Sequence, residues 1–231
     1  MLNVFIPLLP LADFITAYQT SNLVSGKLIV LILVVFSIVA WSVMITKSKE
    51  LKAAQEASRR FQAAFRNETH PLALYLKRQA YPESPLFKIY EAGCIAIGGA
   101  RLEGHRLNQL QVEVVRRATE RSVADEALTL ESRMGFLATA VSASPMLGLL
   151  GTVWGVLDSF AAMAVVGSAN LSAVAPGISG ALLTTVVGLL VAIPSAIGYN
   201  MLTSKIRQIA VQMDNFAQEF VADLQRTFVQ Q

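Results

Sequence analysis

Three long apolar stretches alternate with two charged blocks along this chain. The first stretch, residues 28–45, reads LIVLILVVFSIVAWSVMI and has no charge in eighteen positions. The second runs from about 135 to 166 with a single charge, and the third from about 173 to 202 with none. Such stretches are long enough to cross a bilayer, where backbone amides must be bonded within the segment. The pattern predicts an all-α membrane protein with three transmembrane helices.

The same pattern divides the chain into seven segments. Transmembrane helices are expected at 27–46, 135–166 and 173–202, an N-terminal segment at 1–26, a helical domain at 47–134, a short loop at 167–172 and a C-terminal helix at 203–231. The first segment has no Lys or Arg and is interrupted by Pro7 and Pro10, unlike a signal peptide. We expect it to form a short helix at the outer membrane–water interface, using apolar residues such as Phe5, Ile6, Leu9, Phe14 and Ile15.

Both charged blocks are predicted to be helical. In the first block, three prolines mark breaks between helices: Pro71, Pro82 and Pro85. Further on, apolar residues recur at helical spacing: Leu107, Leu110, Val114 and Ala118. No proline intervenes before Pro145, so we expect one unbroken rod of roughly 50–60 residues, near 80 Å, that continues into the second span. The C-terminal block has its own helical stripe: Ile206, Ile209, Met213, Phe216, Phe220 and Leu224.

The basic residues predict the orientation in the membrane. Eighteen of the nineteen Lys and Arg residues lie at 47–133 or after residue 203, and the nineteenth, Lys27, is at the start of the first span. Segments next to a span that are rich in Lys and Arg remain in the cytoplasm. We therefore expect the N-terminus and the short loop outside, in the periplasm, and both charged blocks inside.

Composition and reactive side chains exclude several classes of protein. The chain is 54% hydrophobic and 15% charged, and its net charge of +3 is spread among carboxylates without a basic and aromatic stripe. Nucleic-acid binding is therefore not expected. Cys94 is the single cysteine, and neither His70 nor His105 is placed to act as its base. With no phosphate-binding glycine loop or metal motif, we expect neither an enzyme nor a cofactor.

The second and third spans differ from the first in their polar and small residues. The first span is mostly Leu, Ile and Val, whereas the other two are rich in Gly, Ser, Thr and Pro. Small and hydroxyl side chains are typical of helices packed against other helices in a membrane. We expect the second and third spans to form a protein-lined interior and the first span to face lipid.

Helical spacing places the small and hydroxyl residues on two faces. One face of the second span carries Gly148, Thr152, Gly155 and Ser159, and one face of the third span carries Ala181, Thr185, Gly188 and Ala192. Counted from the middle of the loop at 1.5 Å per residue, Thr152 and Thr185 both lie roughly 23–26 Å from its tip. Copies arranged in a ring would place a band of hydroxyls around a common axis. Such hydroxyls could hold a water wire or receive a proton, or could simply pack helices together.

Asp158 is the single acid inside a span. A carboxylate within a membrane indicates function by default. It lies about 17 Å from the tip of the hairpin, closer to the outer surface than the threonines. Attraction of protons or cations at an outer vestibule and a packing role both remain open.

The hairpin sequence resembles the TolQ/ExbB branch of the MotA/TolQ/ExbB proton-channel family. The similar segments are SPMLGLLGTVWGVLDSF (144–160) and APGISGALLTTVVGLLVAIPSAIGYN (175–200), in the same order with a short loop between them. The three spans and the large insert after the first also match. Trp154 in GTVWG is more typical of the TolQ members.

The resemblance implies a specific assembly. Members form a five-membered ring in the inner membrane, and their second and third helices line a pore whose threonines match Thr152 and Thr185. A dimer of a single-span TolR- or ExbD-like partner sits inside and carries the proton on a membrane Asp. Proton flow drives work on the outer membrane through a TolA- or TonB-like protein. Gly180 departs from the family, which commonly has Glu there, so we hypothesise that the channel relies on the partner's Asp.

Three functions follow as expectations. The first is a TolQ-like proton-channel subunit of a Tol-Pal-type motor that maintains the cell envelope. The second is an ExbB-like subunit that energises outer-membrane uptake. The third, of another class, is a membrane scaffold that conducts nothing and uses its small residues for packing.

Overall fold

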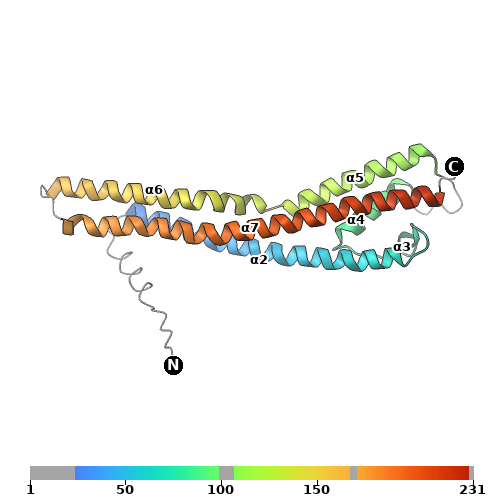
Figure 1. Cartoon of the computed structure of the whole chain (residues 1–231), viewed down its shortest axis with the longest axis horizontal. Helices are drawn as coiled ribbons and strands as arrows, with labels where there is room; N and C mark the ends of the chain where they lie inside the picture. Colours follow the sequence, from blue (N-terminus) through green and yellow to red (C-terminus); the bar gives the residue numbers. More distant parts are fainter. Residues whose placement is uncertain (1–23, 99–106, 167–170, 229–231) are drawn as a thin grey trace, which may run out of the picture. The chain divides into compact units, whose positions relative to one another are not determined.

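The structure is a computed structural model that describes residues 24–98, 107–166 and 171–228. Within these ranges every regular element is a helix: α2 (Val24–Arg66), α3 (Ala73–Leu76), α4 (Pro85–Ala96), α5 (Gln109–Glu131), α6 (Met134–Val166) and α7 (Leu171–Phe228) (Figure 1). The all-α prediction is thereby confirmed for this part of the chain. The expected interfacial helix falls largely on residues 1–23, and the expected loop on 167–170, which lie outside the described residues.

Three of the helices are long and apolar enough to cross a membrane. They contain Gly26–Arg66, Met134–Ala164 and Val174–Phe228, with mean hydropathy of 3.0, 1.6 and 2.1 in their most apolar windows. The three predicted spans correspond to these helices. Both α2 and α7 extend well beyond their apolar parts into charged sequence, as the pattern predicted.

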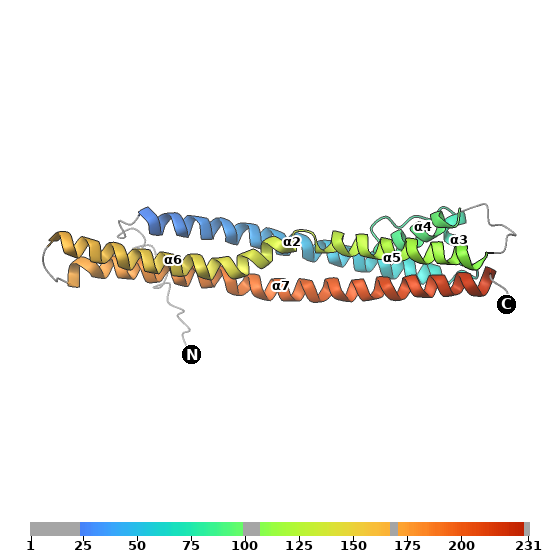
Figure 2. The same ribbon diagram turned by 90° about the horizontal axis from the view of Figure 1, so that it is seen from above.

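The chain forms two compact units. We call Met1–Met44 with Met134–Tyr199 the apolar unit, and Ile45–Arg133 with Asn200–Gln231 the charged unit. In the apolar unit, α6 and the first half of α7 lie side by side in both Figure 1 and Figure 2. Helix α2 packs Ile29 and Leu33 against Val191 of α7. Its other side exposes large apolar side chains, including Leu31, Val35, Ile38 and Trp41, as expected of a helix that faces lipid.

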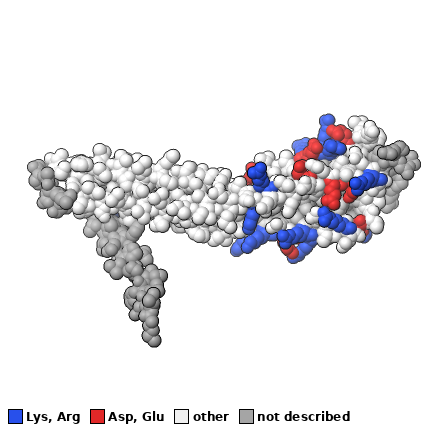
Figure 3. Space-filling view, viewed as in Figure 1, with Lys and Arg blue, Asp and Glu red and all other residues white. Residues whose placement is uncertain are grey.

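The core of the charged unit is aromatic. Phe61 of α2 contacts Phe216 of α7 and Tyr90 of α4 with ring centroids 5.4 and 5.5 Å apart. The whole predicted C-terminal stripe is buried: Ile206, Ile209, Met213, Phe216, Phe220 and Leu224. On the face shown in Figure 3, the Lys, Arg, Asp and Glu side chains gather on this unit.

Helix starts in the charged unit follow from local sequence. The side-chain oxygen of Ser84 accepts the Phe87 N–H, and Pro85 occupies the first helical position of α4. Asn108 and Gln111 form a reciprocal capping box at the start of α5. The predicted breaks at Pro71, Pro82 and Pro85 are confirmed, since α2 ends at Arg66 and only the short α3 precedes α4.

The predicted unbroken rod from residue 107 into the second span is wrong. Helix α5 ends at Glu131, Ser132 is extended, and Arg133 has a left-handed backbone conformation with φ of 67° before α6 begins. Lys47, which is only 1% exposed, stabilises this end of α5. Its ammonium donates to the Thr129 carbonyl oxygen at 3.5 Å and to Ser132 Oγ at 3.2 Å, and pairs with Glu50 at 3.0 Å. A cation at a helix C-terminus also interacts favourably with the helix dipole.

The helix predicted from the apolar stripe at Leu107, Leu110, Val114 and Ala118 is present, but the stripe is not the buried side of α5. The buried positions of α5 include Val112, Val115 and Thr119. Leu110 and Val114 from the predicted stripe are 72% and 48% exposed instead. Apolar residues therefore occupy both sides of α5, and within the described chain Leu110, Val114 and Leu128 remain exposed on the outer side.

Candidate functional site

A seam of small residues joins α6 to α7. On α6 the buried positions facing α7 are Ser144, Gly148, Gly151, Gly155 and Ser159. On α7 the matching positions are Gly177, Ala181, Thr184 and Gly188. Side chains of this size let two membrane helices approach until their backbones touch.

The glycines of the seam face the opposite backbone directly. A Cβ atom built on Gly188 would lie 2.6 Å from the Ser144 carbonyl oxygen, and one on Gly148 would lie 3.0 Å from Thr185 Cα. A Cβ on Gly155 would lie 2.6 Å from the Ala181 methyl group. The two distances of 2.6 Å are too short for a real side chain, and the 3.0 Å at Gly148 would require its neighbour to shift. The close approach of the helices therefore depends on glycine at Gly188 and Gly155 and favours it at Gly148.

Thr184 provides a polar contact inside the seam. Its hydroxyl group is buried, contacts Gly151, and lies 3.0 Å from the Gly148 carbonyl oxygen of α6 and 2.7 Å from the Ala181 carbonyl oxygen of its own helix. This bond joins the two helices where water is excluded, and it explains why a threonine is tolerated between apolar helices.

Thr152 and Thr185 lie at the edge of the seam. Thr152 donates its hydroxyl hydrogen to the Leu149 carbonyl oxygen at 2.7 Å and is partly exposed. Thr185 donates across the seam to the Gly148 carbonyl oxygen at 3.1 Å. Thr152 is one turn along α6 from Gly148, so the two hydroxyl groups are within about 5 Å of the same height. Because the hydroxyl hydrogens are in use, both oxygens are left as acceptors toward any further group.

Of the remaining candidate residues, five lie in the seam, and Asp158 and Gly180 lie outside it. Gly148, Gly155, Ser159, Ala181 and Gly188 all face the opposite helix of the same chain, so packing within one copy is enough to account for them. Asp158 is half-buried on α6, six residues beyond Thr152. Gly180 is half-buried on α7, outside the closest contact.

Sequence reasoning grouped seam and edge residues on one face and missed Thr184, Gly151 and Gly177. The signal was present, because positions 148, 151 and 155 repeat the spacing of a packed helix face. A helix face drawn through Gly148, Gly151 and Gly155 excludes Thr152. That face would have assigned the glycines to the seam and Thr152 to its edge. Elsewhere in the described ranges, His, Cys, Asp and Glu side chains form no group of three that could hold a metal ion.

Comparisons with known proteins add the family context. The MotA/TolQ/ExbB proton channel family matches residues 93–215, which include the whole α6–α7 seam. The Tol-Pal system protein TolQ of Pseudomonas aeruginosa is 35% identical over 204 residues, covering 87% of each chain. The protein of the same name from Haemophilus influenzae is 32% identical over 93% of this chain and 94% of its own. The biopolymer transport protein ExbB of Salmonella typhimurium is 31% identical over 82% of this chain and 77% of its own.

Proposed function

The chain belongs to the MotA/TolQ/ExbB proton channel family, and from this premise we propose that it is a TolQ-like ring subunit of an inner-membrane motor. The motor would convert the proton motive force into work on the outer membrane, as part of a Tol-Pal-type system. The observation that carries the proposal is the α6–α7 seam, which lies inside the matched region and holds two threonine hydroxyls at one height. Members of this family are proton channels and not enzymes.

The orientation is part of the proposal. Residues 1–26 and the loop at 167–172 would lie in the periplasm, with spans at 27–46, 135–166 and 173–202. The charged unit, made of 47–134 and 203–231, would lie in the cytoplasm. Eighteen of nineteen basic residues in the charged blocks support this arrangement.

The proton path would run along Thr152 and Thr185. Several copies, five by family resemblance, would form a ring around a TolR- or ExbD-like dimer whose membrane Asp carries the proton. A protonated carboxyl group is a donor, and the two threonine oxygens have acceptor capacity left to receive it. Gly148, Gly155, Ser159, Ala181 and Gly188 would set the spacing of the pore wall, and Asp158 would act nearer the outer surface. A TolA-like protein would transmit the work.

Gly180 limits what this chain supplies to the proton path. Family members commonly have an acid at that position, which would add a second proton site to the pore wall. With glycine there and Asp158 further along the hairpin, the partner's Asp would be the main proton carrier. The subunit would then provide a polar track rather than a titrating group.

Two rivals stay in view. An ExbB-like role in uptake is favoured by the similarity to the ExbB protein of Salmonella typhimurium, which is 31% identical over 82% of this chain, against 35% over 87% for the TolQ protein of Pseudomonas aeruginosa. A non-conducting scaffold is favoured by the threonine contacts themselves, because bonds to Leu149 and Gly148 are sufficient for packing. The identity of the partner distinguishes a TolQ-like from an ExbB-like subunit. Variants of the two threonines distinguish a proton channel from a non-conducting scaffold.

The decisive experiment replaces the native copy by Thr152→Ala or Thr185→Ala and measures envelope integrity, as sensitivity to detergent. Thr152→Ser and Thr185→Ser, which keep the hydroxyl group, are the matched controls. We expect the Ala variants to assemble normally but lose function, and the Ser variants to retain it. Full function in both Ala variants would favour the scaffold and remove the threonines from the proton path.

A further inference from the structure

Two exposed stripes run along the outer sides of α5 and α7 in the charged unit. The α7 stripe contains Ser204, Gln208, Val211, Asn215, Gln218, Ala222 and Gln225. The α5 stripe contains Leu110, Val114, Arg117, Arg121, Ala124 and Leu128. Both repeat every three and four residues in alternation, which is the spacing of a helix face that packs along another helix.

The α7 stripe is unusual for a solvent-facing helix. It has no charged member over six turns, although the exposed side of α2 in the same unit carries Lys49, Lys52 and Glu56. An exposed helix face normally alternates charges of both signs. A face of Gln, Asn, Ser, Val and Ala can be dehydrated at much lower cost than one of Lys and Glu. This composition indicates a contact surface.

The α5 stripe has apolar ends and a basic middle. Leu110 and Leu128 are 72% and 68% exposed, and Arg117 and Arg121 lie between them. Conversely, α7 has three acids and no Lys or Arg between Gln208 and Gln225. Of these acids, Glu219 and Asp223 pair with Arg66 and Arg226, whereas Asp214 lies next to the stripe member Asn215. The two surfaces are therefore complementary through Arg121 and Asp214 in the middle, and apolar or uncharged at both ends.

The heights of the two stripes also agree. The Leu107 N–H donates to the Phe228 carbonyl oxygen at 3.3 Å, so the start of α5 lies beside the end of α7 and the helices run in opposite directions. Advancing along α5 therefore corresponds to moving back along α7. Leu128, 21 residues beyond Leu107, is level with about residue 207, and Arg121 is level with about residue 214.

In a ring, the neighbouring copy is related by rotation about the ring axis. If the helices run along that axis, rotation leaves the height of every residue unchanged. The α5 stripe of one copy would then meet the α7 stripe of the next with Leu128 opposite Gln208, Arg121 opposite Asp214 and Val114 opposite Ala222. Different patches that meet in this way form a head-to-tail interface, which gives a closed ring when the rotation between copies is a whole fraction of a turn without translation.

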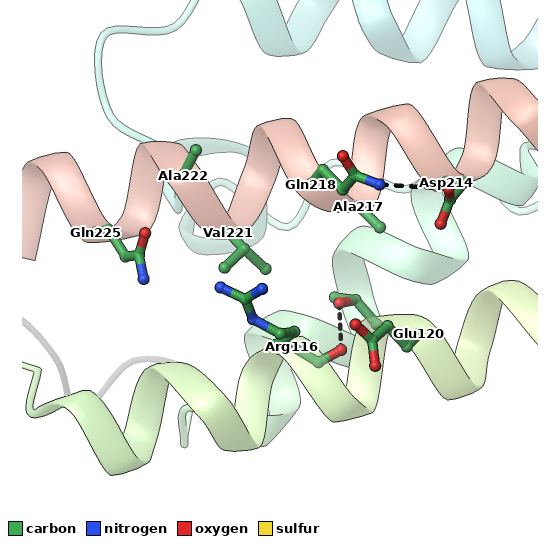
Figure 4. Close-up of a pocket in the computed structure, with 9 residues that line it drawn as sticks. Arg116, Glu120, Asp214, Ala217, Gln218, Val221, Ala222 and Gln225 are labelled. Atoms are coloured by element: carbon green, nitrogen blue, oxygen red, sulfur yellow. Dashed lines mark hydrogen bonds between the residues drawn. The ribbon is translucent and has the colours of Figure 1, made fainter.

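We propose that α5 of one copy packs on α7 of the next, and that this contact joins the charged units of the ring. The proposal rests on the ring of the proposed function and adds which surfaces meet. Arg121 and Asp214 are its central pair, since within the described residues neither has an ion pair in its own chain. Three members of the α7 stripe, Gln218, Ala222 and Gln225, line a groove of about 370 Å³ between α7 and α5 of the same chain (Figure 4). Asp214 of α7 and Arg116 and Glu120 of α5 also line it, and in the proposed contact Arg121 of the neighbouring copy would approach Asp214 from this side.

Disulfide trapping between differently tagged copies tests the contact. One copy carries Leu128→Cys and the other Gln208→Cys, both in the full-length chain in native membranes. Because each chain has one new cysteine, only a contact between copies can join the tags. Disulfides need Cα atoms within about 7 Å. Cys94 is buried and stays in place, and the chain without an added cysteine is the background control.

A mismatched pair supplies the specific control. Leu110 lies about 27 Å from the height of Leu128, so Leu110→Cys with Gln208→Cys should give no doubly tagged band. Leu110 and Gln225 lie at the same height, so Leu110→Cys with Gln225→Cys should give a doubly tagged band. We expect a strong band at twice the chain mass from both level pairs. An intact oligomer without such bands overturns this contact but leaves the proposed function, whereas absence of any oligomer overturns both.

Charge exchange provides a second measurement that does not depend on oxidation. Arg121→Glu and Asp214→Arg each place like charges opposite one another and should lower the fraction of chain in the ring several-fold. The double variant restores opposite charges and should recover the ring. Lys52→Glu makes the same change of charge on α2 and should have no effect. If the double variant is as defective as the single variants, Arg121 and Asp214 do not face each other.

Discussion

Thr184 and Thr185 are neighbours in the chain, yet their hydroxyl groups have different surroundings. Thr184 is buried between α6 and α7, whereas Thr185 lies at the edge of the same seam with Thr152. Helical spacing alone selected Thr152 and Thr185 as candidates but grouped them with glycines that pack against the opposite helix. Spacing defines a face, but it does not show which helix covers that face.

Replacement of Thr184 by valine should lower stability. Thr184→Val keeps the volume but removes the bond to the Gly148 carbonyl oxygen, and interhelical hydrogen bonds in membranes contribute about 0.5–2 kcal/mol. We expect a lower thermal midpoint in detergent. Thr139→Val is the control, because that exposed hydroxyl group bonds only to Gly135 in the preceding turn. Equal midpoints for the two variants would contradict the role given to Thr184.

Asp158→Asn should impair function less than Thr152→Ala. Asp158 lies about 9 Å along α6 from Thr152, so it is not part of the threonine band. Loss of its charge should weaken proton attraction near the outer surface without interrupting the path. Detergent sensitivity of cells carrying each variant is the measurement. If Asp158→Asn were as defective as Thr152→Ala, Asp158 would belong to the essential path. The proposal that the partner's Asp is the main proton carrier would then be wrong.

The thiol of Cys94 should be unreactive in the folded chain. Cys94 is fully buried in α4, and burial raises the pKa of its thiol to about 12. We expect no labelling by a maleimide at pH 8 until the protein is denatured. Rapid labelling of the native protein would show that α4 opens readily.

The same pKa shift predicts a dependence of stability on pH. The folded thiol ionises near 12 and the unfolded thiol near 9.0, so its contribution to the free energy of unfolding is complete below pH 9 and decreases above it. Between pH 9 and 10 the loss should be about 1 kcal/mol. Cys94→Ala should remove this part of the pH dependence, which denaturation curves at the two pH values can measure.

At the scale of helices, the sequence predicted which residues of α7 are buried. It did not predict a helix end, such as that of α5, which depends on a residue far away in the chain. The stripe from Ile206 to Leu224 is buried as its spacing indicated, and its Phe216 and Phe220 belong to the aromatic core. The end of α5 carries no local stop signal such as proline. It is held by Lys47, 82 residues before Thr129 in the chain. The stripe in α5 predicted the helix but not which of its sides is buried, because Leu110 and Val114 are exposed where a second copy is proposed to cover them.

Two glycine variants on α6 and α7 should have opposite effects. Gly188→Ala would push a methyl group against the Ser144 carbonyl oxygen and separate the helices, and overpacking of this kind costs about 1–3 kcal/mol. A Cβ on Gly135 would meet nothing within 4 Å, so Gly135→Ala should stabilise α6 by up to ~1 kcal/mol. Thermal midpoints of the two purified variants give the comparison. A harmless Gly188→Ala would mean that the seam is looser than described.

At the scale of the whole molecule, the paired helices α6 and α7 are proposed to form the pore wall, and the charged unit is proposed to join neighbouring copies. In the proposed motor, the pore wall would need glycine at the α6–α7 contact and threonine at its edge, and the charged unit would need complementary surfaces on α5 and α7. Substitutions at the threonines and substitutions at the glycines or stripes can be made separately. The first test proton conduction and the second test assembly. A scaffold would need the glycines and the stripes but not the threonines.

The most direct test of the central claim is the mass and composition of the complex, extracted gently from native membranes by a tag on this chain. We predict a ring of several copies that holds a small single-span protein with one Asp in its span. The sequence of that partner would decide between a Tol-type and an uptake-type motor. A homo-oligomer without such a partner, obtained repeatedly in several detergents, would contradict the motor and leave the scaffold as the better account.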